Sequence, residues 1–324
     1  MEKAIELVIN PSELGAGTRG SALGPYAVLY AGRKRNSTLF NEISSVVIPN
    51  KNELLDQPIN YLSAKRIDGV CEVYDKVMGQ MKQSLSTSST VLVLSGDHSS
   101  ATATIAGIRN KYPKKKLGVV WVDAHADIHS PYTTPSGNIH GMSLGAALGI
   151  DNKKNQINSP KENVIKKWDW MKKLGPESTH LIKPEDIIYI GLRDIEKQEE
   201  KLISSLNIKT IETSQFQKNG ALKIAKEVEN HFADYDLLYV SFDVDSMDPK
   251  DSSFGTGTPY KNGILVKDAK ILLGEFAKSD KLKCLEIVEI NPLLDNKNKM
   301  GEIGFHLLEN CIKNILEKQK VPLN

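Results

Sequence analysis

Cysteine is scarce in this sequence, and the few cysteines lie far apart. The 324 residues include only Cys71, Cys284 and Cys311, and no two of them form a CxxC pair. An odd number of scattered cysteines argues against a disulfide framework and against a zinc site built from thiolates. We therefore expect a protein of the reducing cytoplasm.

Long hydrophobic runs and an excess of one charge are also missing. No stretch approaches the roughly 18 apolar residues of a membrane span. The opening MEKAIELVIN is charged within its first three residues and lacks the long apolar core of a signal peptide. Lys and Arg number 42 against 40 Asp and Glu, a net charge of +2. This balance argues against a dedicated nucleic-acid surface, so we expect neither a nucleic-acid nor a membrane partner.

Short runs rich in Val and Ile recur along the chain. Several, such as VLVL and LGVVW, are apolar at almost every position, which is typical of strands buried on both faces. The predicted strands span residues 4–10, 44–50, 90–96, 117–124, 186–192, 208–213, 237–245 and 284–292. Helical patterns lie between many of them, for example at residues 69–85, 219–235 and 266–279. Strands that alternate with helices predict an α/β fold with a mostly parallel sheet.

Nothing in the composition marks a domain boundary, so we expect one domain over residues 1–324. The most polar interval, residues 151–185, is a predicted insertion that leaves the sheet. Ser159 and Pro160 are suited to begin a helix there. The apolar face of that helix would consist of Val164, Ile165, Trp168 and Met171. The helix would either pack on the surface by this face or form a lid over a site.

Acidic and histidine side chains follow three of the predicted strands. They are Asp97 and His98 after the third strand, Asp123, His125 and Asp127 after the fourth, and Asp243 and Asp245 at the end of the seventh. Alternate residues of an extended chain point the same way, and ligands of parallel sheets bind beyond the carboxyl ends of the strands. We therefore expect these side chains to converge on one site.

A convergence of carboxylates requires positive charge, because an unpaired buried carboxylate is costly. His98, His125 and the aspartates other than Asp97 supply two imidazoles and four carboxylates, which match two divalent cations joined by a shared carboxylate. A carboxylate-rich set without thiolates favours Mn²⁺ over zinc and leaves Mg²⁺, Fe²⁺ and Co²⁺ open. A lone DxD often marks only a turn, but four of the seven histidines fall between residues 98 and 140. The combination favours a metal centre.

Three motifs in order resemble the metal-binding motifs of the ureohydrolase family, which includes arginase, agmatinase and formimidoylglutamase. They are SGDHS (95–99), DAHAD (123–127) and SFDVDSMDP (241–249), and a looser match lies at TRGSALGP (18–25). The resemblance implies a three-layer α/β/α sandwich with a mostly parallel sheet of about eight strands, and two Mn²⁺ per subunit. By motif position, one ion would be held by His98, Asp123, Asp127 and Asp243, and the other by Asp123, His125, Asp243 and Asp245.

Within that family, the segment TTPSGNIHGM (133–142) looks most like arginase. By this resemblance, Ser136 and Asn138 would contact the α-carboxylate of the substrate. His140 would shuttle the proton.

Three further segments resemble arginase substrate contacts. In GLRDIEKQEE (191–200), Glu196 and Glu199 would contact the α-amino group. In VEINP (288–292), Glu289 would position the guanidinium, and in GTGTP (255–259) Thr258 would place a hydroxyl beside it.

The sequence departs from the arginase pattern at several points. His129 stands where arginases normally carry an Asn that contacts the α-carboxylate, and Glu196 stands where they usually carry Asp. A protonated His129 would pair with the substrate carboxylate; the alternative is that His129 points away and only packs. Ser95 replaces the first Gly of the usual GGDHS, and residues 248–259 are one residue longer than the common spacing. Because His129 and Glu196 both belong to α-group recognition, the resemblance specifies the metal centre more firmly than the substrate.

The resemblance implies hydrolysis of L-arginine to L-ornithine and urea by a metal-bridging hydroxide. The catalytic residues would be His140, Glu289 and Asp127, the last also being a metal ligand. Alternatives are the other guanidino or formimidoyl substrates of the family, namely agmatine, guanidinobutyrate and formimidoylglutamate, or a catalytically inactive regulatory homologue that binds metal. Agmatine lacks the α-carboxylate, so the segments around Ser136 and Glu196 favour arginine. The resemblance also implies a homo-oligomer, a trimer or hexamer.

Overall fold

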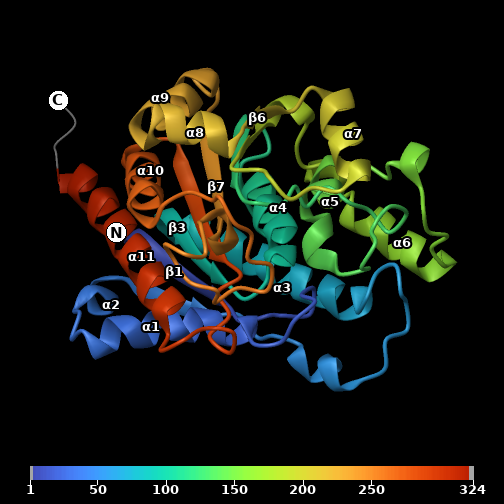
Figure 1. The fold of residues 1–324 in the computed structure, drawn as a ribbon, viewed down its shortest axis with the longest axis horizontal. Coiled ribbons are helices and arrows are strands. Elements are labelled where there is room, and N and C mark those ends of the chain that lie inside the picture. The colour runs from blue at the N-terminus through green and yellow to red at the C-terminus, as the bar shows by residue number, and fades with distance from the viewer. Residues whose placement is uncertain (1–2, 321–324) are drawn as a thin grey trace.

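The computed structural model describes residues 3–320, so the ends of the predicted domain, residues 1–2 and 321–324, lie outside the described residues. Within that range eight strands form one sheet in which every pair is parallel (Figure 1). The strands are β1 (Lys3–Asn10), β2 (Ser44–Val47), β3 (Ser88–Ser95), β4 (Leu117–Val122), β5 (Ile187–Ile190), β6 (Lys209–Ile211), β7 (Leu237–Asp243) and β8 (Leu282–Val288). All eight predicted strands are confirmed.

Helices connect the strands and cover both faces of the sheet. They are α1 (Gly24–Lys34), α2 (Leu39–Glu42), α3 (Ile67–Thr87), α4 (Ala101–Lys111), α5 (Ser143–Leu148), α6 (Glu162–Met171), α7 (Lys197–Leu206), α8 (Thr213–Asn219), α9 (Ala221–His231), α10 (Val266–Lys278) and α11 (Lys299–Lys320). Short 3-10 helices are η1 (Ser21–Leu23), η2 (Asn52–Asp56), η3 (His98–Ser100), η4 (Ile139–Met142), η5 (Lys153–Asn155), η6 (Pro176–Ser178), η7 (Pro184–Asp186) and η8 (Val244–Ser246).

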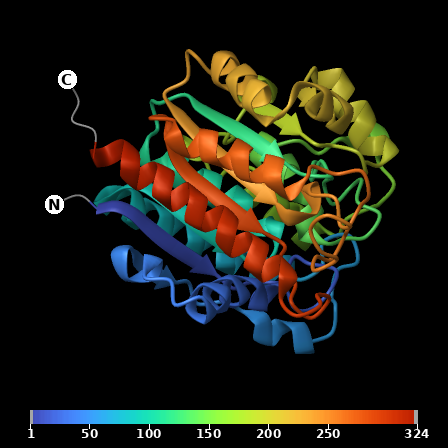
Figure 2. The ribbon, with the colours of Figure 1, turned by 60° about the vertical axis from the view of Figure 1, so that its left-hand side comes forward.

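Two hydrophobic cores, one on each side of the sheet, make the fold three-layered. Residues of α3, α4, α5, α6 and α7 pack against one face, and residues of α1, α8, α9, α10 and α11 pack against the other. Figure 2 shows α11 lying across the second face. The predicted three-layer α/β/α sandwich with a parallel sheet is confirmed.

Each central strand contributes to both cores, which explains its uninterrupted apolar sequence. In β4, Val119 and Trp121 point into the first core while Val120 and Val122 point into the second. All six residues of the strand are buried. Burying such a side chain contributes about 1.5–3 kcal/mol, so a polar residue is disfavoured at every position until the strand ends.

The order of the strands differs from their order in the chain. Across the sheet it is β2-β1-β3-β8-β7-β4-β5-β6. The last two strands, β7 and β8, therefore occupy the centre, between β3 and β4. As a result, the loops that follow β3, β8, β7, β4 and β5 lie next to one another at one edge of the sheet.

Two predicted helix boundaries differ from the structure. The helix predicted at residues 219–235 is shorter in the structure: α9 runs from Ala221 to His231, and Gly220, with a φ of 76°, separates it from α8, which ends at Asn219. The left-handed backbone at Gly220 is the physical reason, because it interrupts the helical hydrogen bonds and costs a glycine little. Earlier in the chain, α6 begins at Glu162, and the residue at its N-cap is Lys161 rather than Ser159 or Pro160.

The polar interval 151–185 is anchored to the rest of the fold by α6. Val164, Trp168 and Met171 of this helix are fully buried in the first core, while Ile165 is partly buried against it. The indole Nε1 of Trp168 donates a hydrogen bond of 2.9 Å to Asp151 Oδ1. The apolar face predicted for this helix is therefore its packing face.

Within residues 3–320, none of the helices is long and apolar enough to cross a membrane.

The burial of Trp168 predicts that α6 is part of the cooperative fold. Trp168→Ala should lower the free energy of unfolding by about 3–5 kcal/mol in urea titrations, because it leaves a large cavity. Trp170→Ala is the matched control, since Trp170 lies on the same helix with 36% of its surface exposed, and should cost less than about 1 kcal/mol. Equal effects of the two substitutions would show that α6 packs only loosely.

Candidate metal centre and adjoining pocket

The predicted site residues lie at the carboxyl ends of neighbouring strands. Asp97 and His98 follow β3, Asp123 follows β4, Asp243 ends β7, and Glu289 follows β8. The backbone N–H of His98 donates to Glu289 Oε1 over 2.9 Å, although the two residues are 191 positions apart. The strand order, rather than sequence proximity, brings these groups together.

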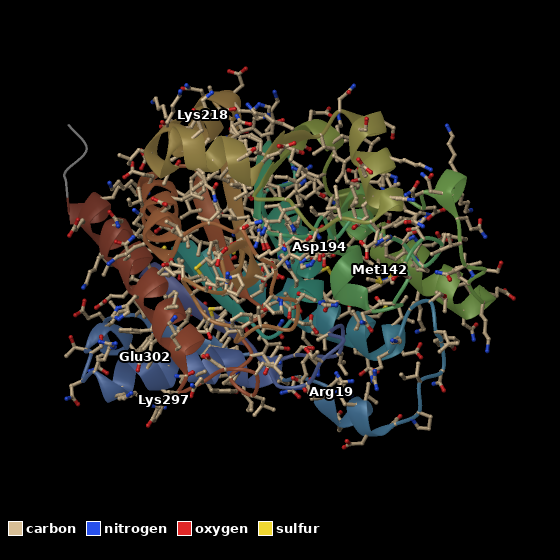
Figure 3. The ribbon with its side chains drawn as sticks, viewed as in Figure 1. Arg19, Met142, Asp194, Lys218, Lys297 and Glu302 are labelled. Atoms are coloured by element: carbon tan, nitrogen blue, oxygen red, sulfur yellow. The ribbon has the colours of Figure 1, made fainter. Side chains whose placement is uncertain are left out.

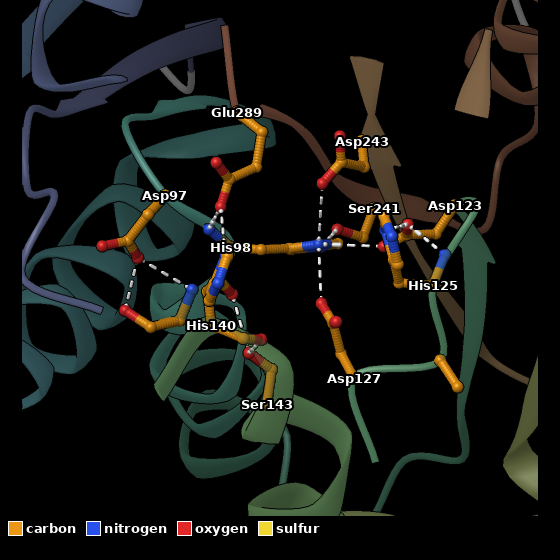
Figure 4. Close-up of polar contacts among 12 residues, drawn as sticks. Asp97, His98, Asp123, His125, Asp127, His140, Ser143, Ser241, Asp243 and Glu289 are labelled. Atoms are coloured by element: carbon orange, nitrogen blue, oxygen red, sulfur yellow. Dashed lines mark hydrogen bonds and ion pairs between the residues drawn. The ribbon is translucent and has the colours of Figure 1, made fainter. Parts of the chain in front are cut away.

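His98 is surrounded by carboxylates. Its Nδ1 lies 3.0 Å from Asp127 Oδ2, 3.1 Å from Asp123 Oδ2 and 3.4 Å from Asp243 Oδ2 (Figure 4). Burial alone disfavours a charged imidazole, but the proximity of these carboxylates raises the pKa of His98 well above its usual value. The position therefore demands positive charge, which a proton or a metal ion supplies.

His125 lies against a second group of carboxylates. Its Nδ1 is 3.1 Å from Asp245 Oδ2 and 3.5 Å from Asp123 Oδ1, and its Nε2 is 3.4 Å from Asp194 Oδ2. Asp123 thus reaches both histidines, through Oδ2 to His98 and through Oδ1 to His125. The two groups share a carboxylate, as a pair of neighbouring metal ions requires.

The donor atoms fit divalent cations. Nδ1 of His98 and Oδ2 of Asp123 are both buried, and within residues 3–320 neither makes a hydrogen bond of good geometry. Burial and the charges of Asp245 and Asp123 raise the pKa of Asp243, so the carboxylates repel one another. Ligand atoms of His98, Asp123 and Asp243, and likewise of Asp123, His125 and Asp245, lie within 4.8 Å of one another. Such oxygen-rich sets with one imidazole suit Mn²⁺ and its harder neighbours.

The ring of His98 is held from below by the sheet. It stacks on Trp121, with ring centroids 4.0 Å apart and planes 5° from parallel, and its Nε2 lies 2.7 Å from Ser241 Oγ. Trp121 and Ser241 are register partners across β4 and β7. With Nε2 engaged by Ser241, Nδ1 is the nitrogen that faces the carboxylates.

Two of the site residues have strained backbones. Asp127 has a φ of 49° and Glu289 a φ of 65°, values that non-glycine residues adopt rarely. Asp127 is held there by hydrogen bonds that its carbonyl accepts, including one of 2.8 Å from the N–H of Leu144. The N–H of Glu289 donates to the carbonyl of Gly96. Strain of this kind concentrates at functional sites, where it aims a side chain.

His140 and Glu289 form a buried pair beside the carboxylate groups. His140 Nδ1 lies 3.0 Å from Glu289 Oε1 (Figure 4). Burial alone would lower the pKa of His140, but the hydrogen bond with Glu289 outweighs it and raises this pKa to about 9. Burial likewise works against a charged Glu289, yet His140 lowers the pKa of that carboxyl. The pair is therefore a protonated imidazole facing a carboxylate near neutral pH.

A pocket of about 260 Å³ opens above these groups. Its lining includes His125, Asp127, His140, Asp243 and Thr258 close to the carboxylate groups, and Thr134, Pro135, Ser136, Asn138, Gly141, His129, Asp194, Glu196 and Glu199 elsewhere on its wall. The loop after β5 contributes Asp194, which Figure 3 labels. All the residues predicted to contact substrate, apart from Glu289, therefore line one pocket.

His129, Glu196 and Glu199 form a separate cluster on the pocket wall. His129 Nε2 lies 3.3 Å from Glu196 Oε2 and 3.6 Å from Glu199 Oε2. The hydrogen bond with His129 lowers the pKa of Glu196 to about 2, whereas burial raises the pKa of Glu199 well above its usual value. The two predicted departures from the arginase pattern, His129 and Glu196, are thus in direct contact.

Thr258 contacts Asp245, one of the proposed metal-binding carboxylates. Its hydroxyl donates to Asp245 Oδ2 over 2.9 Å. Thr258 also lines the pocket. Its predicted contact with the guanidinium stays a prediction.

The sequence reasoning missed three residues that shape the site. Ser241 had a signal, because it lies two residues before Asp243 in the same strand and so points the same way. Asp194 lay unnoticed inside the GLRD segment. Arg193 gave no signal: its guanidinium donates to the carbonyls of Asp245 and Tyr260, and so ties together loops distant in sequence.

Comparisons with known proteins agree with this architecture. The model of the arginase family matches residues 3–313. The arginase of Bacillus subtilis (strain 168) is 31% identical over 318 residues, covering 96% of this chain and 98% of that protein. The arginase of Bacillus caldovelox is 30% identical over 311 residues, covering 94% and 97%. The crystal structure of Entamoeba histolytica arginase in complex with L-ornithine superposes with a TM-score of 0.81 at 26% identity, covering 96% and 99% of the two chains. The chain belongs to the arginase family.

Proposed function

We propose that this protein is a manganese-dependent hydrolase that cleaves the guanidinium group of L-arginine to give L-ornithine and urea. The observation that carries the proposal is the convergence of two histidines and four aspartates from three strand ends around His98 and His125. The similarity to bacterial arginases along almost the whole chain supports the same substrate.

The carboxylates and imidazoles are proposed to hold two Mn²⁺ per chain. One ion would be held by His98, Asp123, Asp127 and Asp243, and the other by Asp123, His125, Asp243 and Asp245. When bound, two such cations lower the pKa of a water molecule toward neutrality and so supply a nucleophile. Around them, Ser241, Trp121 and Thr258 keep the donor side chains oriented.

The pocket wall is proposed to orient the substrate. Glu289 would accept charge-assisted hydrogen bonds from the planar guanidinium, with Thr258 beside it. Ser136 and Asn138 would contact the far end of the substrate, as would Glu196, while Glu199 lies behind them with only 2% of its surface exposed. These contacts would place the guanidinium carbon next to Asp127 and Asp243.

His140 is proposed to deliver the proton that completes cleavage. The bond between the guanidinium carbon and the side-chain nitrogen breaks only when that nitrogen gains a proton. Because Glu289 is a carboxylate, His140 Nδ1 donates to it. The other ring nitrogen, Nε2, is then left to deliver a proton to the leaving amine of ornithine.

We also propose a cytoplasmic location and a homo-oligomer, a trimer or hexamer. Cys71, Cys284 and Cys311 are free thiols, and the last two are buried in the cores. Unpaired buried thiols are typical of a reducing compartment. The oligomer rests on the family resemblance.

The central test is urea release. Protein loaded with Mn²⁺ should release urea and L-ornithine from L-arginine, with a turnover on the order of 1–1,000 s⁻¹. Chelation should abolish the activity, and added Mn²⁺ should restore it. Absence of urea from fully loaded protein would refute the proposed reaction.

The ligand assignment predicts the metal content of a variant. Asp127→Asn should reduce bound Mn²⁺ from two ions to one per chain, measured by elemental analysis after dialysis, because the amide lacks the negative charge. Asn also tolerates the left-handed backbone of Asp127. The control is Asp248→Asn: Asp248 lies in the third motif, SFDVDSMDP, but is not an assigned ligand, and its Oδ2 accepts the N–H of Asn262. Two ions in Asp127→Asn, or one in the control, would contradict the assignment.

The proton-delivery role predicts a selective loss of turnover. His140→Asn should lower kcat about 100-fold to 10,000-fold, with the metal content unchanged. His180→Asn serves as the control, since His180 is exposed, does not line the pocket and donates through Nδ1 to the carbonyl of Lys172. A kcat within twofold of the parent in His140→Asn would rule the role out.

A further inference from the structure

His129 is a buried side chain whose polar atoms both face protein groups. It is 4% exposed. Its Nδ1 lies 3.0 Å from Thr133 Oγ1, and its Nε2 lies 3.3 Å from Glu196 Oε2. A carboxylate only accepts hydrogen bonds, so Nε2 donates to Glu196. The nitrogen that would reach a substrate carboxylate is therefore already engaged.

Glu199 fixes the position of this pair. It is 2% exposed. Its Oε1 accepts from the N–H of Ile128, and its Oε2 accepts from the N–H of Glu196, both over 3.2 Å. These two hydrogen bonds join the loop after β4 to the start of α7. The distance between Glu196 and His129 is consequently fixed.

The charges around the pair favour a cation. Five carboxylates line the pocket, and of these Asp194, Glu196 and Glu199 are not assigned to metal. Among the described residues that line it, none is Lys or Arg. A substrate carboxylate would meet the neutral groups of Ser136 and Asn138, whereas an ammonium would meet the half-exposed carboxylate of Glu196. Both contacts would be charge-assisted hydrogen bonds, but only the contact with Glu196 also joins two opposite charges.

We propose that His129 is a positioning residue for Glu196, so that the pocket requires an ammonium group at the far end of a guanidino substrate and tolerates the loss of its carboxylate. The inference rests on the proposed hydrolysis of guanidino compounds and names the feature by which they are selected. It assigns His129 a different role from the carboxylate contact that the sequence predicts.

Two analogues of L-arginine test the substrate requirement directly. Agmatine lacks only the carboxylate, and 5-guanidinopentanoate lacks only the α-amino group. We expect kcat/KM for agmatine to exceed that for 5-guanidinopentanoate at least tenfold. Equal values, or the reverse order, would overturn the inference.

Binding measured by calorimetry separates the two proposals. No urea from L-arginine or from either analogue contradicts the proposed function. Tighter binding of agmatine than of 5-guanidinopentanoate still supports the selection of an ammonium group, and weaker binding contradicts it.

Substitution of Glu196 tests the ammonium contact. Glu196→Gln should raise KM at least tenfold for L-arginine and agmatine, leave kcat within about twofold, and leave 5-guanidinopentanoate unaffected. Glu200→Gln is the matched control. It also removes one negative charge, but Glu200 is an exposed residue of α7 that does not line the pocket. Similar increases in KM from both substitutions would show that Glu196 acts only through its negative charge and not through a contact with the ammonium group. That result would overturn the inference.

Substitution of His129 tests the positioning role. His129→Phe keeps a ring but removes both nitrogens, and should raise KM for L-arginine and agmatine alike. In a Glu196→Gln background it should have no additional effect on KM. A loss confined to the two substrates with a carboxylate would show that His129 contacts that group and would overturn the inference. If His129→Phe does not fold, the Glu196→Gln comparison and the analogues decide the question.

Metal content excludes one other role for the cluster. Ligand atoms of His129, Glu196 and Glu199 lie within 4.8 Å of one another, close enough for an ion. We expect two Mn²⁺ per chain in both the parent protein and Glu196→Gln. A third ion that Glu196→Gln removes would overturn the inference.

Discussion

The main physical constraint on this structure is the mutual repulsion of carboxylates gathered at the carboxyl ends of its buried strands. Asp123, Asp127, Asp243 and Asp245 lie within a few ångströms of two imidazoles, and each of these carboxylates is nearly or fully buried. Isolated ionised carboxylates are not stable in such surroundings, so the fold is complete only with compensating positive charge. The apolar strands supply the rigidity that keeps the carboxylates together despite their repulsion. Filling the proposed metal positions would therefore also stabilise the fold.

Contacts around the donors fix their positions despite that repulsion. Trp121 and Ser241 hold one imidazole from the sheet, while Thr258 and Arg193 hold the loop that carries Asp245. Above the donors, one part of the pocket lies beside the His140–Glu289 pair, and another part is lined by His129 and Glu196. In the proposed reaction the first part would serve bond cleavage, and the second would distinguish one guanidino compound from another.

The sequence predicted the strands, and the convergence of the polar side chains that follow them, because one physical rule governs both. A strand buried on both faces tolerates no polar residue until it ends, so the change from VVWV to Asp123 marks the strand end and the site together. Contacts between loops were not predictable in this way. The pairing of His129 with Glu196 depends on how α7 sits against the loop after β4, and the hydrogen bonds of Arg193 depend on the loop after β5 meeting the connection between β7 and α10. The start of α9 at Ala221 was missed because a single glycine near the end of an amphipathic pattern is compatible with a helix on either side of it.

The placement of β7 and β8 at the centre of the sheet has a consequence for the growing polypeptide. A nascent chain that ends before residue 237 possesses β3 and β4, but the strands that separate them are not yet made. Each of these two strands then exposes a row of unsatisfied backbone groups, which invites association with other chains. Insertion of the final two strands satisfies these groups and, in the same event, unites His98 with Asp243. Newly synthesised molecules thus acquire the complete set of proposed metal donors only once translation has passed the third motif.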